Sequence, residues 1–157
     1  MHMSNPRKSG PEFQYGFTLV ELIMTMLIIA ILAVVAAPRF TDSNAFQSRG
    51  FADQVQATLR YAQKVAIAQR RYVCATFTAS QLALTIGSTS GCVDANLNLP
   101  TGSVNYIDAP SGVTISPVPA NFNFNAQGKP SFVAAQSITV SGYGTPITVE
   151  AETGYVH

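Results

Sequence analysis

The longest apolar segment of the chain covers residues 17–37 and contains a single charged side chain, Glu21. At about 1.5 Å per residue, a helix of this length crosses a bilayer core of roughly 30 Å. A carboxylate inside such a span is unfavourable by about 3 kcal/mol even on mild scales. The pattern therefore predicts a transmembrane helix over residues 17–37, and it makes Glu21 a residue whose charge needs a partner.

A second pattern, after Pro38, is that of an amphipathic helix over residues 38–71. Apolar residues recur at helical spacing, and polar ones lie opposite them; the apolar stripe is Phe51, Val55, Leu59, Ala62 and Val65 or Ala66, and the polar side is Asp53, Gln56, Arg60, Gln63 and Lys64. Pro38 predicts a kink. Asp42, Ser43 and Asn44 are good N-cap residue types, and Gly50 is a weak point. We therefore allow a break or bend between Pro38 and Gly50, and expect the stripe to be buried against a sheet.

The remaining residues, 72–157, have the pattern of a β-rich domain. Alternating or β-branched runs predict strands over residues 72–78, 82–86, 113–115, 122–124, 137–140 and 147–150. Residues 79–80 and 142–146 are the predicted turns, and residues 87–112 are expected to be rich in loops. The fold class is thus α+β: a long N-terminal helix, half transmembrane and half amphipathic, packed on an antiparallel sheet.

The charged residues at the two ends of the chain bear on membrane topology and on nucleic-acid binding. Residues 1–16 carry Arg7, Lys8 and Glu12, and the positive-inside rule keeps such a basic segment in the cytoplasm. Residues 72–157 contain one Lys and four acidic residues, so their net charge is −3. These residues are Lys129, Asp94, Asp108, Glu150 and Glu152. Composition therefore argues against a basic nucleic-acid-binding surface on this domain.

The run Gly16-Phe17-Thr18-Leu19-Val20-Glu21 resembles the type IV prepilin signature, which pilins share with the pseudopilins of type II secretion. The resemblance implies that residues 1–16 are a leader removed by prepilin peptidase after Gly16, and that the new N-terminal residue, Phe17, is methylated. It also implies a single-pass protein of the bacterial inner membrane with residues 72–157 as a periplasmic head. The alternative is a plain single-pass anchor without processing, which needs only length and apolarity.

Two further segments narrow the resemblance. Residues 122–128, 137–140, 147–149 and 153–154, together with residues 59–67, resemble the H-type pseudopilin and FimT-like minor pilins. The run Ala37-Pro38-Arg39-Phe40 also resembles minor pilins of mannose-sensitive haemagglutinin systems. These likenesses imply a structural minor pilin or pseudopilin of a type II secretion pseudopilus or a type IV pilus. Its partners would be other pilin subunits and the inner-membrane assembly platform.

The same resemblance gives Glu21 a role in assembly. In filaments of this family the matching Glu faces the free N-terminal amine of an adjacent subunit, and such pairing would neutralise the buried charge. The alternative is that Glu21 extends to the cytoplasmic headgroups from the end of the span.

Two other functions compete with a purely structural one. FimT-like proteins capture DNA with a C-terminal Gly-Arg-x-Arg motif, whereas the matching residues here are Gly154-Tyr155-Val156-His157, without either Arg. Phosphate contacts need Lys or Arg, so nucleic acid is an unlikely partner. Arg70 and Arg71 are weak DNA-binding candidates that fit better as cations at a helix C-terminus. The second competitor is a surface adhesin pilin.

The residues that could carry chemistry point to a structural disulfide and to no catalytic or metal site. Cys74 and Cys92 both follow the span, so they can form a disulfide in an oxidising compartment, or remain two separate buried thiols. After the leader the one His is His157, so no Ser-His-Asp set can be built, and no cofactor motif is present. Asp94, Asn96 and Asn98 begin like a calcium loop, but Leu99 and Asn105 replace its Gly and Glu. We expect no enzyme, metal or cofactor.

Overall fold

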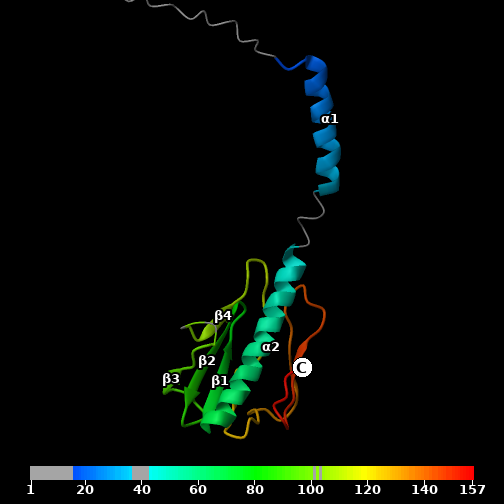
Figure 1. Ribbon diagram of the computed structural model, residues 1–157. Coiled ribbons are helices and arrows are strands. Elements are labelled where there is room, and N and C mark those ends of the chain that lie inside the picture. The colour runs from blue at the N-terminus through cyan, green and yellow to red at the C-terminus, as the bar shows by residue number, and fades with distance from the viewer. Residues whose placement is uncertain (1–15, 37–42, 101, 103) are drawn as a thin grey trace, which may run out of the picture. The chain divides into compact units, whose positions relative to one another are not determined.

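The computed structural model describes residues 16–36, 43–100, 102 and 104–157, and the side chains of residues 34–36 and 43 are not described. The chain divides into two compact units, Met1–Phe40 and Thr41–His157. The elements (Figure 1) are α1 (Leu19–Ala36), α2 (Ser43–Gln69), β1 (Tyr72–Phe77), β2 (Gln81–Gly87), β3 (Ala95–Asn96), β4 (Tyr106–Asp108), β5 (Phe122–Phe124), β6 (Gln136–Ile138) and β7 (Ile147–Val149). Leader residues 1–15 and the predicted kink at Pro38 lie outside the described residues.

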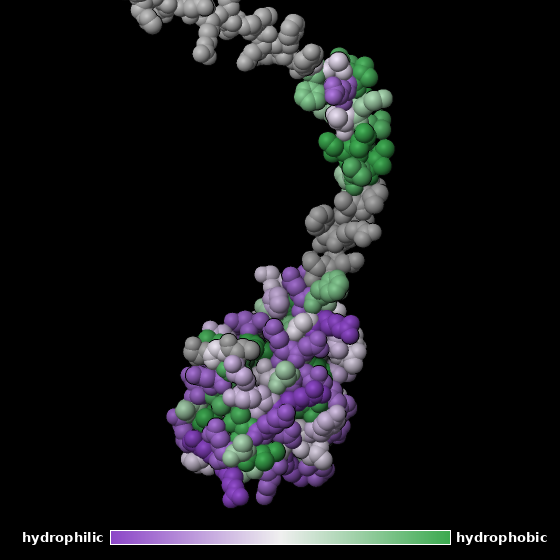
Figure 2. All heavy atoms as spheres, in the orientation of Figure 1, coloured by the Kyte–Doolittle hydropathy of each residue, from purple (hydrophilic) through white to green (hydrophobic). Residues whose placement is uncertain are grey.

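The first unit is described only as one helix, α1. It consists almost entirely of Leu, Ile, Met, Val and Ala, most of which favour helices or pack well on them. Its large apolar side chains from Leu19 to Leu32 are each at least half exposed, and they cover its surface in Figure 2. Among the described residues, no helix has the length and apolarity needed to cross a membrane.

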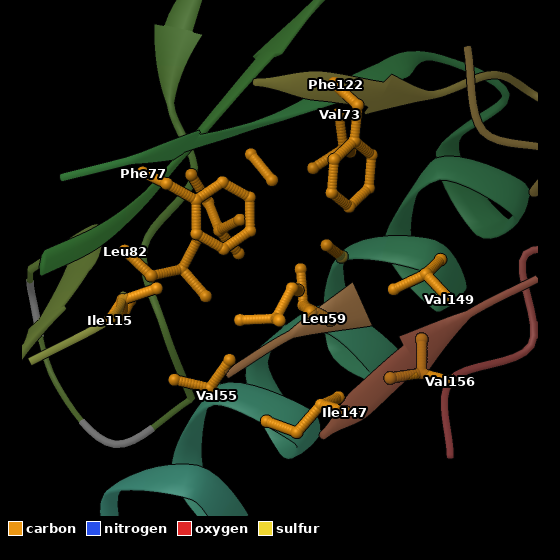
Figure 3. Packing of buried hydrophobic residues seen from close by; sticks show 14 of the residues in the cluster. Val55, Leu59, Val73, Phe77, Leu82, Ile115, Phe122, Ile147, Val149 and Val156 are labelled. Carbon is orange, nitrogen blue, oxygen red and sulfur yellow. The ribbon is translucent and has the colours of Figure 1, made fainter. Parts of the chain in front are cut away.

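The second unit is α2 packed on an antiparallel sheet, so the α+β class is confirmed. The predicted stripe faces the sheet: Phe51, Val55, Leu59, Ala62 and Ala66 are all buried. Helix α2 runs through Gly50 without a break and contacts β1, β2 and β5. In Figure 3, Val55 and Leu59 from α2 point toward Phe77 and Leu82 from the sheet.

Helix α2 ends at Gln69, two residues before the predicted end, because Arg70 adopts a left-handed backbone with φ 52°. The Arg70 N–H donates to Ile67 O (3.3 Å) and the Arg71 N–H donates to Ala66 O (3.2 Å). This pair of hydrogen bonds is the Schellman motif, in which the left-handed position is usually Gly. The carbonyls of Ala66 and Ile67 are thereby satisfied, with an Arg in the left-handed position that suits Gly.

The main sheet has the strand order β3-β2-β1-β5, with β4 also paired to β2. The predicted hairpin is present, with Val73 opposite Ile86 and Phe77 opposite Leu82. Residues 87–112, expected to be rich in loops, contain two short strands as well: β3 pairs with the end of β2 and β4 with its beginning.

A smaller sheet pairs β6 with β7, joined through the predicted turn at residues 142–146. Residues 155–157 run along β7, where the Thr148 and His157 backbones exchange hydrogen bonds of 2.7 and 2.9 Å. The predicted strand over residues 113–115 is wrong. Ile115 forms one isolated bridge with Val140, while its N–H donates to Ala79 O. The hydrogen bonds of this segment go to two different segments, so it does not pair continuously with either one as a strand would.

Candidate functional site

The residues of the proposed processing and assembly site, 16–21, lie just before the start of α1 and in its first turn. The Glu21 N–H donates to Thr18 Oγ1 (3.2 Å), and the Leu22 N–H donates to Thr18 O (3.1 Å). Thr18 is therefore the N-cap of α1, and Glu21 is three residues later, the spacing of a capping box. An acidic side chain in the first turn is also favoured by the helix dipole. Thr18 and Glu21 thus have a local structural role beside any functional one.

Gly16 and Phe17 precede this cap and are open to an approaching molecule. A Cβ added at Gly16 would have no atom within 4 Å, and Phe17 is 81% exposed. Cleavage after Gly16 would leave an amine on Phe17, four residues before Glu21 in the chain. Within the described residues Glu21 has no ion-pair partner, so its carboxylate is available for one.

Most of the surface of α1 is apolar, because its Leu, Ile and Met side chains are exposed; the visible face in Figure 2 is largely green, with a hydrophilic patch near the start of the helix. An exposed apolar surface of this extent marks a site of contact with protein or lipid.

The two candidate DNA-binding residues are engaged in the head in different ways, Arg70 through its backbone and Arg71 through its side chain. Arg70 forms the helix cap described above, and Arg71 forms an ion pair with Asp94. Asp94 Oδ2 also accepts the Ser88 N–H at 2.7 Å. Hydrogen bonds from Ser88, chiefly from its backbone N–H, and the Arg71 guanidinium hold the pKa of Asp94 below its ordinary value of 3.8. Arg71 is thus partly neutralised by its own fold and is a poor site for phosphate.

The two cysteines are joined. Cys74 in β1 and Cys92 in the loop after β2 form a disulfide with a Cα–Cα separation of 5.8 Å and a sequence separation of 18. Such a loop closure contributes about 3 kcal/mol in the chain-entropy model. Gly87 allows the close approach, because a Cβ there would lie 2.6 Å from Cys92 Cα.

The calcium-like run does not form a site. Asp94 is bonded to Arg71 and Ser88, Asn96 pairs with Thr85 in the sheet, and the Tyr61 hydroxyl donates to Asn98 O. Within the described part of the chain, no three His, Cys, Asp or Glu side chains are grouped as metal ligands.

Sequence reasoning missed a clamp that fixes the C-terminal segment to α2. Gln63, expected only on the polar side of the helix, donates through Nε2 to Gly128 O (3.1 Å) and Thr153 O (2.8 Å). Gly154 has φ +68°, and a Cβ there would lie 2.1 Å from Gly128 O. Gly128 and Gly154 were the sequence signal that could have indicated this clamp, since they end two of the segments that resemble the H-type pseudopilin.

Arg60 adds a second link one turn before Gln63. Its Nε donates to Val156 O at 3.0 Å. Two residues on the same side of α2 thus hold residues 153–156 in place, so this segment is part of the head's structure.

Comparison with known proteins agrees with the geometry at the start of α1. A family model described as the prokaryotic N-terminal methylation motif matches residues 13–37. Over 56 residues the chain is 38% identical to the type IV narrow pilus major component PilA5 of Thermus thermophilus, a match to 36% of this chain and 48% of the relative. The chain thus spans about half the length of the curated relative that it matches.

Two crystal structures of the type IV minor pilin FimU of Pseudomonas aeruginosa share the fold. They have TM-scores of 0.53 and 0.56 at 17% and 18% identity, covering 69% and 75% of this chain and 90% of theirs. The chain therefore resembles type IV pilins in two separate respects: it carries an N-terminal methylation motif on an exposed apolar helix, and its head has the fold of these minor pilins.

Proposed function

We propose that the chain is a minor pilin or pseudopilin, a structural subunit of a type II secretion pseudopilus or a type IV pilus. Prepilin peptidase cuts it after Gly16, Phe17 is methylated, and residues 17–37 hold it in the inner membrane with the head in the periplasm. It then joins other subunits through its N-terminal helix. The observation that carries the proposal is the methylation motif matched at residues 13–37, together with a helix, α1, whose large apolar side chains are each at least half exposed.

The test of processing is the mass of the full chain extracted from membranes of cells with active prepilin peptidase. We expect an N-terminus at Phe17, heavier by one methyl group. Gly16→Val should leave the leader attached, because a branched side chain obstructs access to the peptide bond. Gly10→Val, in the leader but away from the proposed bond, is the matched control and should be processed. An intact Met1 N-terminus in the parent would contradict the proposal.

Within this function, Glu21 pairs in the filament with the Phe17 amine of a neighbouring subunit. Two complementary charges are tolerated in a low-dielectric core, whereas one alone is costly. Support comes from the position of Glu21, which is exposed and has no ion-pair partner in the described part of the chain. In the precursor, before assembly, Glu21 is expected at the level of the headgroups.

Replacement of Glu21 distinguishes pairing with the Phe17 amine of a neighbouring subunit from a position at the headgroups alone. Glu21→Ala should insert and be cleaved at least as well as the parent, because removal of a charge from an apolar span eases insertion. Its crosslinking to other subunits and its amount in sheared filaments should fall sharply, because a buried ammonium is left unpaired. Glu21→Gln should be nearly as poor, and Glu21→Asp intermediate. Assembly of Glu21→Ala at the parent level would show that Glu21 only extends to the headgroups.

DNA capture is the weaker candidate. The engagement of Arg71 by Asp94 and the net charge of −3 from residue 72 onward both reduce the affinity for phosphate. We expect gel-shift titration at moderate salt to give only weak binding to duplex DNA. Sub-micromolar, salt-sensitive binding that is lost in the Arg70→Ala, Arg71→Ala double variant would reverse this ranking.

A further inference from the structure

A polar cleft of about 230 Å³ lies on the face of the main sheet that points away from α2. The strand alternation that buries Val73 and Ala75 places Cys74 and Thr76 on this outer face. The register sets Thr85 of β2 and Asn123 of β5 on either side of Cys74. Further lining comes from the loops around the strands, through Ser90, Gly91, Asn121 and Ser131.

The walls of the cleft are held by bonds within the head. The Cys74–Cys92 disulfide fixes the loop after β2 over the sheet, and Asn123 Nδ2 donates to Ser90 O at 3.2 Å. On the other side, Asn121 Oδ1 accepts the Phe77 N–H at 2.8 Å. The cleft is therefore shaped before any ligand arrives, which lowers the entropy lost on binding.

Several polar groups of the cleft remain free. Among the described residues, the hydroxyls of Thr76, Thr85 and Ser90 make no hydrogen bond to protein, and neither does the Asn121 amide nitrogen. Hydroxyl groups both donate and accept, and an amide nitrogen donates. No lining residue is charged. These groups suit an uncharged ligand that offers both donors and acceptors at short intervals.

We propose that this cleft binds a neutral carbohydrate, one ring of a longer glycan chain. Sugar hydroxyls match the free hydroxyl and amide groups, whereas phosphate or carboxylate would find no cation in the lining. The cleft is smaller than the roughly 300–1,000 Å³ typical of sites for drug-sized ligands. Its size suits a single sugar ring, with the rest of the glycan extending over the open side of the cleft. The inference goes beyond the subunit role and does not depend on it.

The test uses the full chain in micelles of a detergent without a sugar headgroup, titrated by calorimetry. The probes are the tetramers of N-acetylglucosamine and of glucose, and tetragalacturonate as an acidic counterpart. We expect saturable binding of at least one neutral tetramer with Kd of about 1 mM or tighter, and at least tenfold weaker binding of the acidic one. No saturable binding of either neutral tetramer, or equal binding of the acidic one, would overturn the proposal.

Variants locate the binding. Thr85→Val keeps the shape but removes one hydroxyl and should weaken the neutral probe about three- to tenfold. Thr76→Trp, on an exposed strand position, should fill the cleft and abolish binding. Thr148→Val, the same change on β7 in the smaller sheet, is the matched control and should bind like the parent. Near-ultraviolet circular dichroism checks the fold of each. Parent-like affinity in both cleft variants would exclude this cleft as the site.

Discussion

Leu27 in α1 and Leu59 in α2 are the same residue type in the same kind of secondary structure, yet Leu27 is 59% exposed and Leu59 is 0% exposed. Helix α2 has one apolar stripe, and the sheet of its own unit covers it. In helix α1 the large apolar side chains from Leu19 to Leu32 are each at least half exposed and form no single stripe. The apolar face of α2 is thus buried within its own unit, whereas the apolar side chains of α1 are exposed.

The largest effect should come from the same substitution in the two helices. Leu59→Ala removes a fully buried side chain and should lower the free energy of unfolding of the head by about 2–5 kcal/mol. Leu27→Ala should leave the head's stability unchanged. Urea titration of the full chain in micelles, followed by near-ultraviolet circular dichroism of the tyrosines, measures both. Equal losses would mean that α1 contributes to the head's core.

A second effect tests the clamp that only the head possesses. Gly154→Ala adds a Cβ that would overlap Gly128 O and forces a non-Gly residue to φ +68°, so we expect a loss of about 1–3 kcal/mol or more. Gly144→Ala is the control, because a Cβ there meets no atom within 4 Å. The same urea titration compares them, and similar midpoints for the two variants would count against the tight packing of Gly154.

A smaller effect, of opposite sign, is expected at the end of α2. Arg70→Gly relieves the left-handed strain in the Schellman motif and should stabilise the head by about 0.5–1 kcal/mol. Ala68→Gly, two residues earlier and inside the helix, should instead destabilise it by about 1 kcal/mol. Thermal unfolding of the pair gives the signs, and destabilisation by both would show that the Arg70 side chain contributes more than its backbone strain.

The smallest effect concerns Asp94. Because the folded pKa of Asp94 lies below its ordinary 3.8, the folded head binds fewer protons and gains stability at higher pH. This contribution is complete above pH 3.8 and is lost as pH falls through the folded pKa. Urea midpoints of the parent and of Asp94→Asn should therefore differ slightly at about pH 6 and converge toward about pH 2.5. A constant difference across this range would show that ionisation of Asp94 does not stabilise the head.

The features that sequence predicted well have short-range causes. The apolar run of α1, the stripe of α2 and the hairpin of β1 and β2 each show their period within a few residues. The short strands β3 and β4 were missed because Ala95–Asn96 and Tyr106–Asp108 lack the alternation of β-branched and aromatic residues that marked the other strands. They are strands because they pair with β2. The strand expected at residues 113–115 failed because Ile115 bonds to partners from two different segments.

The candidate site divides in the same way. The run from Gly16 to Glu21 is recognisable from adjacent residues, so sequence alone was enough to single it out. The capping role of Thr18 follows from the three-residue spacing between Thr18 and Glu21. The polar cleft was not predictable, because Thr85, Cys74 and Asn123 come from three strands and lie on one face only once the register is set.

Sequence by itself determined the apolar α1, the amphipathic α2, the β-rich character of residues 72–157 and the run resembling a processing signature, because each is visible in the pattern of residues near in the chain. Tertiary structure alone decided the Gln63 clamp, whose acceptors lie 65 and 90 residues away, the pairing of Arg71 with Asp94 and the outer cleft. Hydrogen bonds and ion pairs require donor and acceptor within about 3 Å, and residues distant in the chain reach that separation only when the packed core has fixed where each segment lies.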